Sequence, residues 1–124
     1  MTSRAPAMSA PVIRQAATRT DLEDRGLLAQ SSGPEMPVSG LTLWRGGEDG
    51  ASGPEAGVEE CEKGPSVWQF DHSELVYVLA GTMTVAADGA EPMEVSPGDA
   101  ILFPRGWSGE VHIHETMRKV YARF

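Results

Sequence analysis

Short segments typical of β-strands follow one another closely through the second half of the chain. They are rich in β-branched and aromatic residues, and turn sequences such as Asp88-Gly89 and Pro97-Gly98 separate them. We expect strands at 40–46, 66–70, 74–80, 82–87, 93–95, 100–103, 109–115 and 118–124. About eight strands with a turn every 8–12 residues predict an all-β protein, either a sandwich or a barrel.

The first part of the chain has a different character. Residues 1–11 are rich in Ala, Pro and Ser and are expected to be mobile. Thr20, with Glu23 three positions later and Gly26 as a stop, is a helix-start signal that predicts one or two helical turns at most. Residues 46–57 hold five glycines and predict a flexible acidic loop. We therefore expect an N-terminal extension over residues 1–40 and a barrel over 41–124.

Composition excludes several classes of partner. The chain has 124 residues and a net charge of −8, which disfavours binding to nucleic acid or to an anionic membrane surface. No apolar run approaches the length needed to span a bilayer, and the first residues do not resemble a secretory signal. Cys61 is the one cysteine, so no internal disulfide is possible. These features predict a cytoplasmic protein.

Two segments anchored by turns carry a family resemblance. In the first, Glu74 precedes Gly81 by six intervening residues; in the second, five residues separate Gly98 from Pro104-Arg105-Gly106. Taken together and in this order, they resemble the two motifs of the cupin family, whose fold is a small double-sheet jelly roll. The resemblance covers roughly residues 41–124. It implies an all-β cupin barrel preceded by a short N-terminal extension.

The flanking segments resemble one cupin subfamily, which includes ureidoglycine aminohydrolases and an ethanolamine-utilisation protein. That subfamily has Trp-Glu-Cys before the first motif and Arg-Lys-x-Tyr near the end of the domain. Here the first segment is Glu59-Glu60-Cys61, with the tryptophan replaced, and the second is intact as Arg118-Lys119-Val120-Tyr121. This resemblance implies a substrate that contains nitrogen.

The metal ligands of a typical cupin are missing. The resemblance implies histidines at the positions of Trp68, Phe70 and Gly109, together with the carboxylate of Glu74. Indole, phenyl and hydrogen cannot coordinate a metal, and a transition-metal site needs three or four converging N, S or O ligands. One carboxylate suffices at most for a weakly held, largely hydrated divalent metal such as Mg²⁺. We therefore expect no metal site and no cofactor.

Glu74 is the central candidate for catalysis. If its carboxyl group faces the barrel interior, loss of hydration should raise its pKa, which suits general acid–base work. Lys119 is its expected counterpart if the last strand turns that side chain inward, but the alternative register, with Val120, Ala122 and Phe124 buried, is at least as good. His72 lies two residues before Glu74, at a corner where it either joins the site or bonds to a neighbour at the rim.

The expected substrate-binding residues surround Glu74. Trp68 and Phe70 would form flat apolar walls, unless they only fill the barrel, and Val76 and Val111 would complete the interior. Arg105 and Trp107 sit at the rim turn, where they could meet a substrate carboxylate or another subunit.

These residues support three interpretations of function. The first is an enzyme of the isomerase, lyase or aminohydrolase type that acts on a small polar metabolite without a tightly bound metal. Oxygenase chemistry does not fit, because it needs a redox metal with open positions. The second is a non-catalytic barrel that binds a small molecule or accompanies an enzyme. The third is a structural homodimer whose barrel is packed shut. A homodimer is expected in each case, since pairing would cover the sheet edges.

Overall fold

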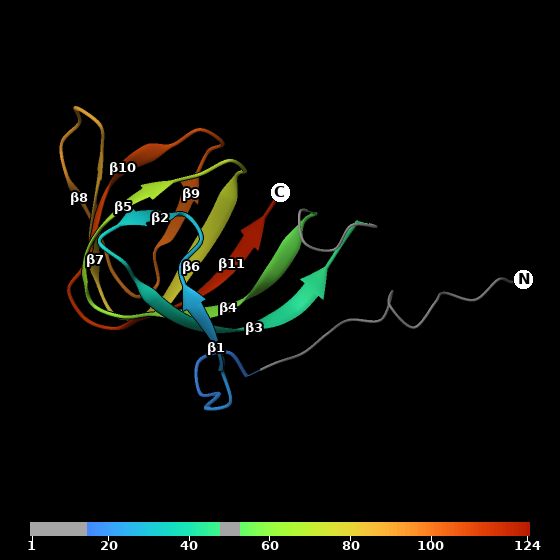
Figure 1. The fold of residues 1–124 in the computed structure, drawn as a ribbon. Helices are drawn as coiled ribbons and strands as arrows, with labels where there is room; N and C mark the ends of the chain where they lie inside the picture. Colours follow the sequence, from blue (N-terminus) through green and yellow to red (C-terminus); the bar gives the residue numbers. More distant parts are fainter. Residues whose placement is uncertain (1–14, 48–52) are drawn as a thin grey trace, which may run out of the picture.

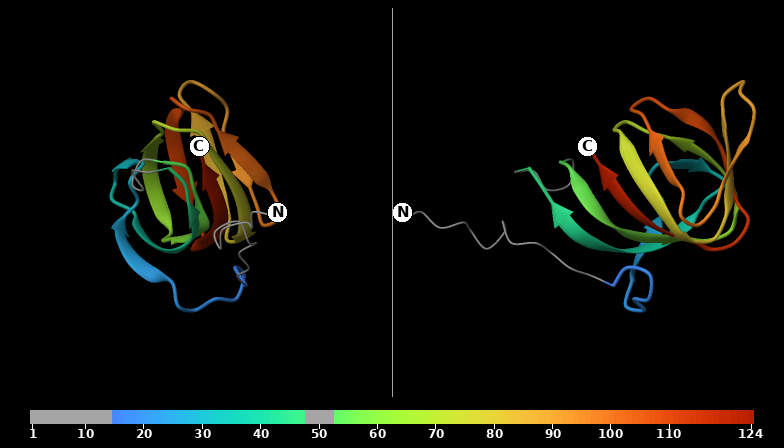
Figure 2. Two further views of the ribbon diagram at one scale, coloured as in Figure 1. Left: turned by 90° about the vertical axis from the view of Figure 1, so that its right-hand side faces the viewer. Right: turned by 180° about the vertical axis from the view of Figure 1, so that it is seen from behind.

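A computed structural model of the chain describes residues 15–47 and 53–124. Two antiparallel sheets face each other and curl into a barrel (Figures 1 and 2). The strands are β1 (Glu23–Leu27), β2 (Ser31–Gly33), β3 (Pro37–Arg45), β4 (Glu55–Cys61), β5 (Gly64–Gln69), β6 (Glu74–Ala80), β7 (Met83–Ala87), β8 (Met93–Val95), β9 (Ala100–Phe103), β10 (Ser108–Ile113) and β11 (Met117–Arg123). The larger sheet has the order β1-β3-β4-β11-β6-β9, and the smaller has the order β2-β5-β10-β7-β8. The predicted all-β jelly roll is confirmed.

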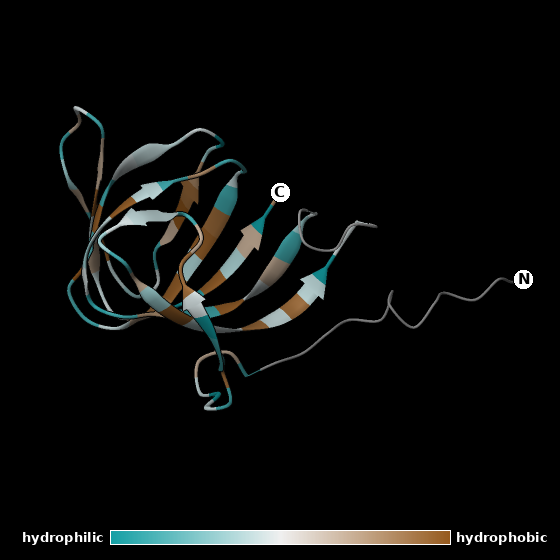
Figure 3. Cartoon of the chain, in the orientation of Figure 1, coloured by the Kyte–Doolittle hydropathy of each residue, from teal (hydrophilic) through white to brown (hydrophobic). Residues whose placement is uncertain are grey.

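The core lies between the two sheets and is made by alternate residues of the strands. Side chains alternate between buried and exposed along β6 and β10, as expected for strands that present one face to a core. Polar and apolar segments accordingly alternate along the strands of the larger sheet (Figure 3). The fully buried apolar residues with the largest volumes include Trp68, Tyr121, Phe103 and Met36.

The N-terminal part differs from expectation. The helix predicted after Thr20 is wrong: Glu23–Leu27 forms β1, which pairs with β3, and no helix forms within residues 15–47. Pairing along a sheet edge overrides the local helix signal, since it satisfies the backbone of this segment. The strands therefore begin at Glu23, whereas we expected the barrel to begin at residue 41.

Two sequence predictions fall wholly or partly outside the described residues. The expected mobility of residues 1–11 concerns residues outside the described part of the chain. The same applies to residues 48–52 of the expected loop, whereas Glu55, Ala56 and Gly57, also assigned to that loop, belong to β4. In the described part of the chain, no helix has the length and hydropathy needed to cross a bilayer.

Candidate functional site

A buried lysine lies between two carboxylates inside the barrel. Lys119 of β11 has no exposed surface, and its Nζ lies 3.5 Å from Glu59 Oε1 and 3.5 Å from Glu74 Oε2. Strand register explains why these three side chains lie close together. Lys119 is directly opposite Glu59 on β4. On its other side, Lys119 pairs with Val78 of β6, next to a register shift between Arg118 and Lys119. Glu74 is itself 3% exposed. The structure therefore selects the register with Lys119 inward, and the alternative register is wrong.

The charges of this cluster depend on one another. Burial by itself lowers the pKa of Lys119, but the charge of Glu74, with smaller contributions from Cys61 and Glu59, outweighs burial and raises it above the usual lysine value. The ammonium group is therefore kept charged. The pKa of Glu59 is raised, first because the carboxyl group is buried and also because Glu74 is close, although Lys119 and Arg25 oppose the shift. The cations around Glu59 therefore do not fully offset the effect of its burial on the pKa.

His72 connects Glu74 to the rim of the barrel. Its Nε2 lies 3.4 Å from Glu74 Oε1, and its Nδ1 lies 2.7 Å from Asp71 Oδ1. The Asp71 side chain is 97% exposed, whereas that of Glu74 is 4% exposed. The hydrogen bond from His72 is the first cause of a lowered Asp71 pKa. The imidazole of His72 therefore connects the buried carboxylate of Glu74 with the solvent-exposed carboxylate of Asp71.

A second polar cluster surrounds Glu55 near the end of the same strands. Tyr121 Oη donates to Glu55, which also receives Arg45 Nε at 3.0 Å and an Arg123 nitrogen at 2.9 Å. Burial of Glu55 raises its pKa, but the bonds and charges of these three partners together lower it below its ordinary value. Arg25 joins the clusters, because it donates to Tyr121 Oη at 3.0 Å and lies 3.8 Å from Glu59.

The two clusters line one cavity of about 580 Å³. This volume is within the range of small-molecule sites. Four glutamates and three arginines contribute to its wall, whereas Lys119 is not part of it. The residues that line it are Glu23, Arg25, Leu27, Leu28, Ala29, Gln30, Val38, Thr42, Arg45, Glu55, Glu59, Glu74, Tyr121 and Arg123. Glu74 is therefore accessible from a polar, charged space rather than from one walled by aromatic rings.

The expected aromatic walls fill the barrel instead. Phe70 stacks on Phe103 with ring centres 4.7 Å apart, and Trp107 packs edge-on against Phe103 at 5.0 Å. Trp68 is wholly buried against both phenylalanines, and its ring lies 4.9 Å from Lys119 Nζ. Neither these rings nor Val76 and Val111 line the cavity that reaches Glu74. The direct role of Trp68 in the site is therefore a cation–π contact with the buried ammonium.

The residues at the family's metal-ligand positions do not fit a transition metal. Trp68 and Phe70 occupy two of them as packed core residues. At the third, a Cβ on Gly109 would lie 2.3 Å from the carbonyl oxygen of Ala86 and 2.6 Å from the Trp107 ring, so no larger side chain is accommodated. Glu74, the fourth, already faces the ammonium of Lys119. Within the parts of the chain that the structure describes, no three His, Cys, Asp or Glu side chains converge as metal ligands would.

The structure brings together Glu74, Lys119 and His72, the three residues for which catalysis was predicted. Arg105 is exposed in the turn after β9, and Trp107 is partly buried. Sequence reasoning missed the partners of these groups, which are Glu59, Glu55, Arg25, Tyr121 and Arg123. One signal was available: Glu55, Gly57, Glu59 and Cys61 share one face of a strand, so two acids recur on the side that carries a buried cysteine.

Comparison of the sequence with family models assigns the chain to a protein family. Residues 49–121 match the model of the EutQ-like cupin domain. Among solved structures, the Clostridium difficile EutQ protein is 21% identical, with a TM-score of 0.61, and the alignment covers 80% of this chain and 75% of that one. A DUF861-family protein from Thermotoga maritima is 28% identical, with a TM-score of 0.52, and 54% and 76% of the two chains are covered.

An enzyme is also among the similar structures. The ectoine synthase of P. lautus is 17% identical with a TM-score of 0.59, and the alignment covers 69% of this chain and 62% of that one. At this identity the likeness concerns the fold alone. No curated protein matches the chain.

Proposed function

Because the chain belongs to the EutQ-like cupin family, we propose that it binds a small polar metabolite in the mouth of the barrel and acts on it without a tightly bound metal. The proposal rests on one observation: Glu74 is buried, reaches a polar cavity, and contacts Lys119 on one oxygen and His72 on the other. A carboxylate held in this way is suited to moving a proton.

In this proposal Glu74 is the general base. It removes a proton from the bound metabolite, and the ammonium of Lys119, which lies 3.5 Å from Glu74 Oε2 without lining the cavity, stabilises the negative charge left on the metabolite through space. The proton moves to His72 through the 3.4 Å contact, and the other imidazole nitrogen faces the exposed Asp71. Isomerisation, elimination and hydrolytic deamination all use such a step. Oxygenase chemistry is not proposed, because the side chains at the ligand positions cannot hold a redox metal.

The proposal also makes the metal site of this barrel a degenerate one. Lys119 supplies a permanent positive charge 3.5 Å from Glu74 Oε2. An ammonium stabilises negative charge but provides no open coordination position. The chemistry is thereby restricted to proton transfer and electrostatic stabilisation.

The deciding experiment uses Glu74→Gln, with Glu110→Gln on the exposed face of β10 as the matched control. Wild-type protein is incubated with a panel of small amino, hydroxy and ureido acids, and conversion is followed by proton NMR. For a converted compound, Glu74→Gln should reduce turnover by roughly 100-fold or more and leave binding largely intact, because proton transfer contributes about that much. Glu110→Gln should behave as wild type, and turnover should survive dialysis against a chelator.

Other outcomes have definite meanings. Unchanged turnover in Glu74→Gln would remove Glu74 from the mechanism, and loss of turnover on chelation would contradict metal independence. A compound that binds in the cavity and is never converted would favour the alternative function, a non-catalytic ligand-binding or accessory cupin.

A homodimer is part of either function. β9 is an edge strand of the larger sheet, and the outward side chains beside it are apolar: Leu75 faces Leu102 across β6 and β9, and they are 46% and 53% exposed. Tyr77, 47% exposed, extends this surface. A second copy placed there would cover both the apolar residues and the free strand edge.

Leu102→Glu should therefore give a monomer where the wild-type protein is a dimer, as measured by sedimentation velocity. A charge buried without a partner in the interface disfavours association. Leu27→Glu is the control, because Leu27 is similarly exposed, at 50%, on β1 at the opposite edge of the sheet. A monomeric wild-type protein, or a variant that still dimerises, would contradict this interface.

We place the protein in the cytoplasm. The support is its single cysteine, which is buried and has no partner for an internal disulfide. Fractionation of cells that recovers the protein outside the cytoplasm would overturn this assignment.

A further inference from the structure

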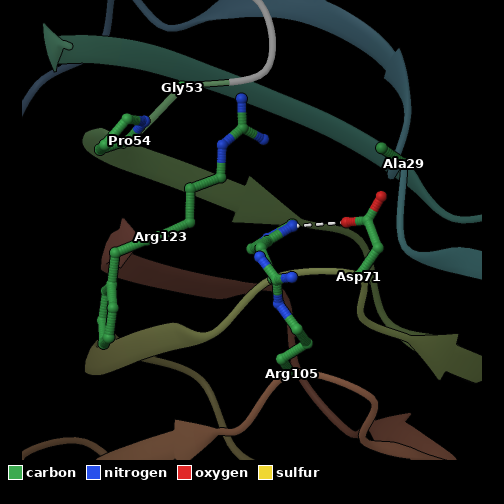
Figure 4. A pocket seen from close by; sticks show the side chains of 8 residues that line it. Ala29, Gly53, Pro54, Asp71, Arg105 and Arg123 are labelled. Atoms are coloured by element: carbon green, nitrogen blue, oxygen red, sulfur yellow. Dashed lines mark hydrogen bonds and ion pairs between the residues drawn. The ribbon is translucent and has the colours of Figure 1, made fainter. Parts of the chain in front are cut away.

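A second, smaller cavity opens at the rim of the barrel and collects positive charge. It has a volume of about 350 Å³. Arg105, from the turn after β9, and Arg123, from the end of β11, both extend into it (Figure 4). The remaining wall is Ala29, Gly53, Pro54, Asp71, His72 and Phe124. Two guanidinium groups in one small cavity stand out in a chain whose net charge is −8.

Protein acceptors do not occupy all the hydrogen-bond donors of the two arginines. Within the described residues the guanidinium group of Arg105 makes no hydrogen bond or ion pair, and its effect on Asp71 is a weak, through-space attraction. Arg123 gives one nitrogen to Glu55 at 2.9 Å and retains other donors. Asp71, the acidic side chain in the wall, is engaged by His72 at 2.7 Å. Within the described residues, the guanidinium group of Arg105 and the remaining donors of Arg123 are therefore available to a ligand.

This cavity adjoins the proposed catalytic group. It shares Ala29 and Arg123 with the larger cavity that contains Glu74. It also contains His72, whose Nε2 contacts the Glu74 carboxylate. A ligand held by the arginines would thus present its other end to His72, which contacts Glu74 of the adjoining cavity.

We propose that Arg105 and Arg123 bind the carboxylate of a small monocarboxylate metabolite, whose hydroxyl or amino group then points toward His72 and Glu74. Guanidinium groups bind carboxylates through paired hydrogen bonds, which orients the ligand as well as holding it. The inference names the substrate class for the proposed function and rests on that function for its catalytic meaning. Binding itself is testable without any turnover.

The test compares lactate with lactamide, which have the same shape and differ in charge. Binding to the isotopically labelled full chain is followed by NMR through the His72 ring and arginine side-chain signals. Lactate should shift these signals saturably, and lactamide should bind roughly tenfold more weakly or worse, as expected for loss of a charge-assisted bond. Arg105→Gln should weaken lactate binding by about the same factor. Lys63→Gln, which removes an exposed charge that lines neither cavity, should leave it unchanged.

Several results would overturn the assignment. These are equal binding of lactate and lactamide, no saturable binding of lactate, an equal effect of Arg105→Gln and Lys63→Gln, or tighter binding of inorganic phosphate than of lactate. The carboxylate site and the proposed enzymatic function can fail independently of each other. If carboxylates bind as expected but no compound is converted, the carboxylate site holds and the enzyme proposal fails. If only compounds without a carboxylate are converted, in a manner that depends on Glu74, the reverse is true.

Discussion

Lys119→Met is expected to lower the free energy of unfolding by about 3–5 kcal/mol at pH 7, as is typical when one partner of a buried ion pair is removed. Lys119 is wholly buried and lies 3.5 Å from both Glu59 and Glu74. Methionine fills a similar volume, so the loss reports charge rather than a cavity. Without the ammonium, two carboxylates lie close together, and the basic side chains that still contact them among the described residues are Arg25, 3.8 Å from Glu59, and His72, 3.4 Å from Glu74. Urea unfolding measures the effect.

The loss of unfolding free energy in Lys119→Met should depend on pH. The pKa of Glu59 is already raised in the wild-type protein by burial and by Glu74, and Lys119 opposes that shift. Removing Lys119 should raise it further. A carboxyl group with a raised folded-state pKa contributes stability below its unfolded pKa and loses it as pH rises through the folded value. The deficit of Lys119→Met should therefore shrink when pH falls from 7 toward 5.

Two further variants separate charge from general damage. Lys119→Met combined with Glu74→Gln should recover most of the lost stability, because the remaining carboxylate of Glu59 retains Arg25. Lys63→Met, at an exposed position, should change stability little. A Lys119→Met protein as stable as Lys63→Met at pH 7 would show that the buried charge cluster does not have the energetics described above.

Gly81→Ala is expected to destabilise the protein by roughly 2–5 kcal/mol, of which about 1–2 kcal/mol comes from backbone conformation and about 1–3 kcal/mol from overpacking. Gly81 has φ of +83°, and a Cβ there would lie 2.4 Å from the carbonyl oxygen of Thr116 and 2.7 Å from Met117 Cα. Both are backbone atoms, so neither can move aside as a side chain would. The contact holds the end of β6 against the start of β11, two residues before Lys119.

Gly106→Ala is the matched control. Gly106 has a similar φ of +87°, but nothing lies within 4 Å of an added Cβ. It should show only the conformational part of the loss, about 1–2 kcal/mol. Equal losses for the two variants in urea unfolding would contradict a close approach at Gly81.

Local signals in the sequence were sufficient to predict most strands of the barrel. Alternating β-branched and aromatic residues predicted the strands from residue 66 onward, and Gly81, Gly98 and Gly106 all adopt the positive φ that reversals require. The same signals failed between residues 20 and 40. There a capping pattern favoured a helix, but β1 gains hydrogen bonds from β3, a partner that the local sequence does not reveal.

The candidate site was only partly predictable. Glu74 was expected to face inward from its motif, and the aromatic residues at the histidine positions were visible by inspection. The orientation of Lys119 was undecided, because residues 118–124 alternate equally well in either register. Pairing with β4 and β6 decides it: a charged side chain is tolerated inside the barrel only where Glu59 and Glu74 neutralise it.

The sequence by itself therefore determined the cupin fold, most of its strands, the turns that join them, and the absence of imidazoles at the expected positions. Only the tertiary structure decided which charges meet. Glu74 and Lys119 are 45 residues apart, and a shift of one residue in strand pairing would turn every side chain of β11 to the opposite face. Register is a property of neighbouring strands, and through it the fold places a lysine, two carboxylates and a histidine at one site.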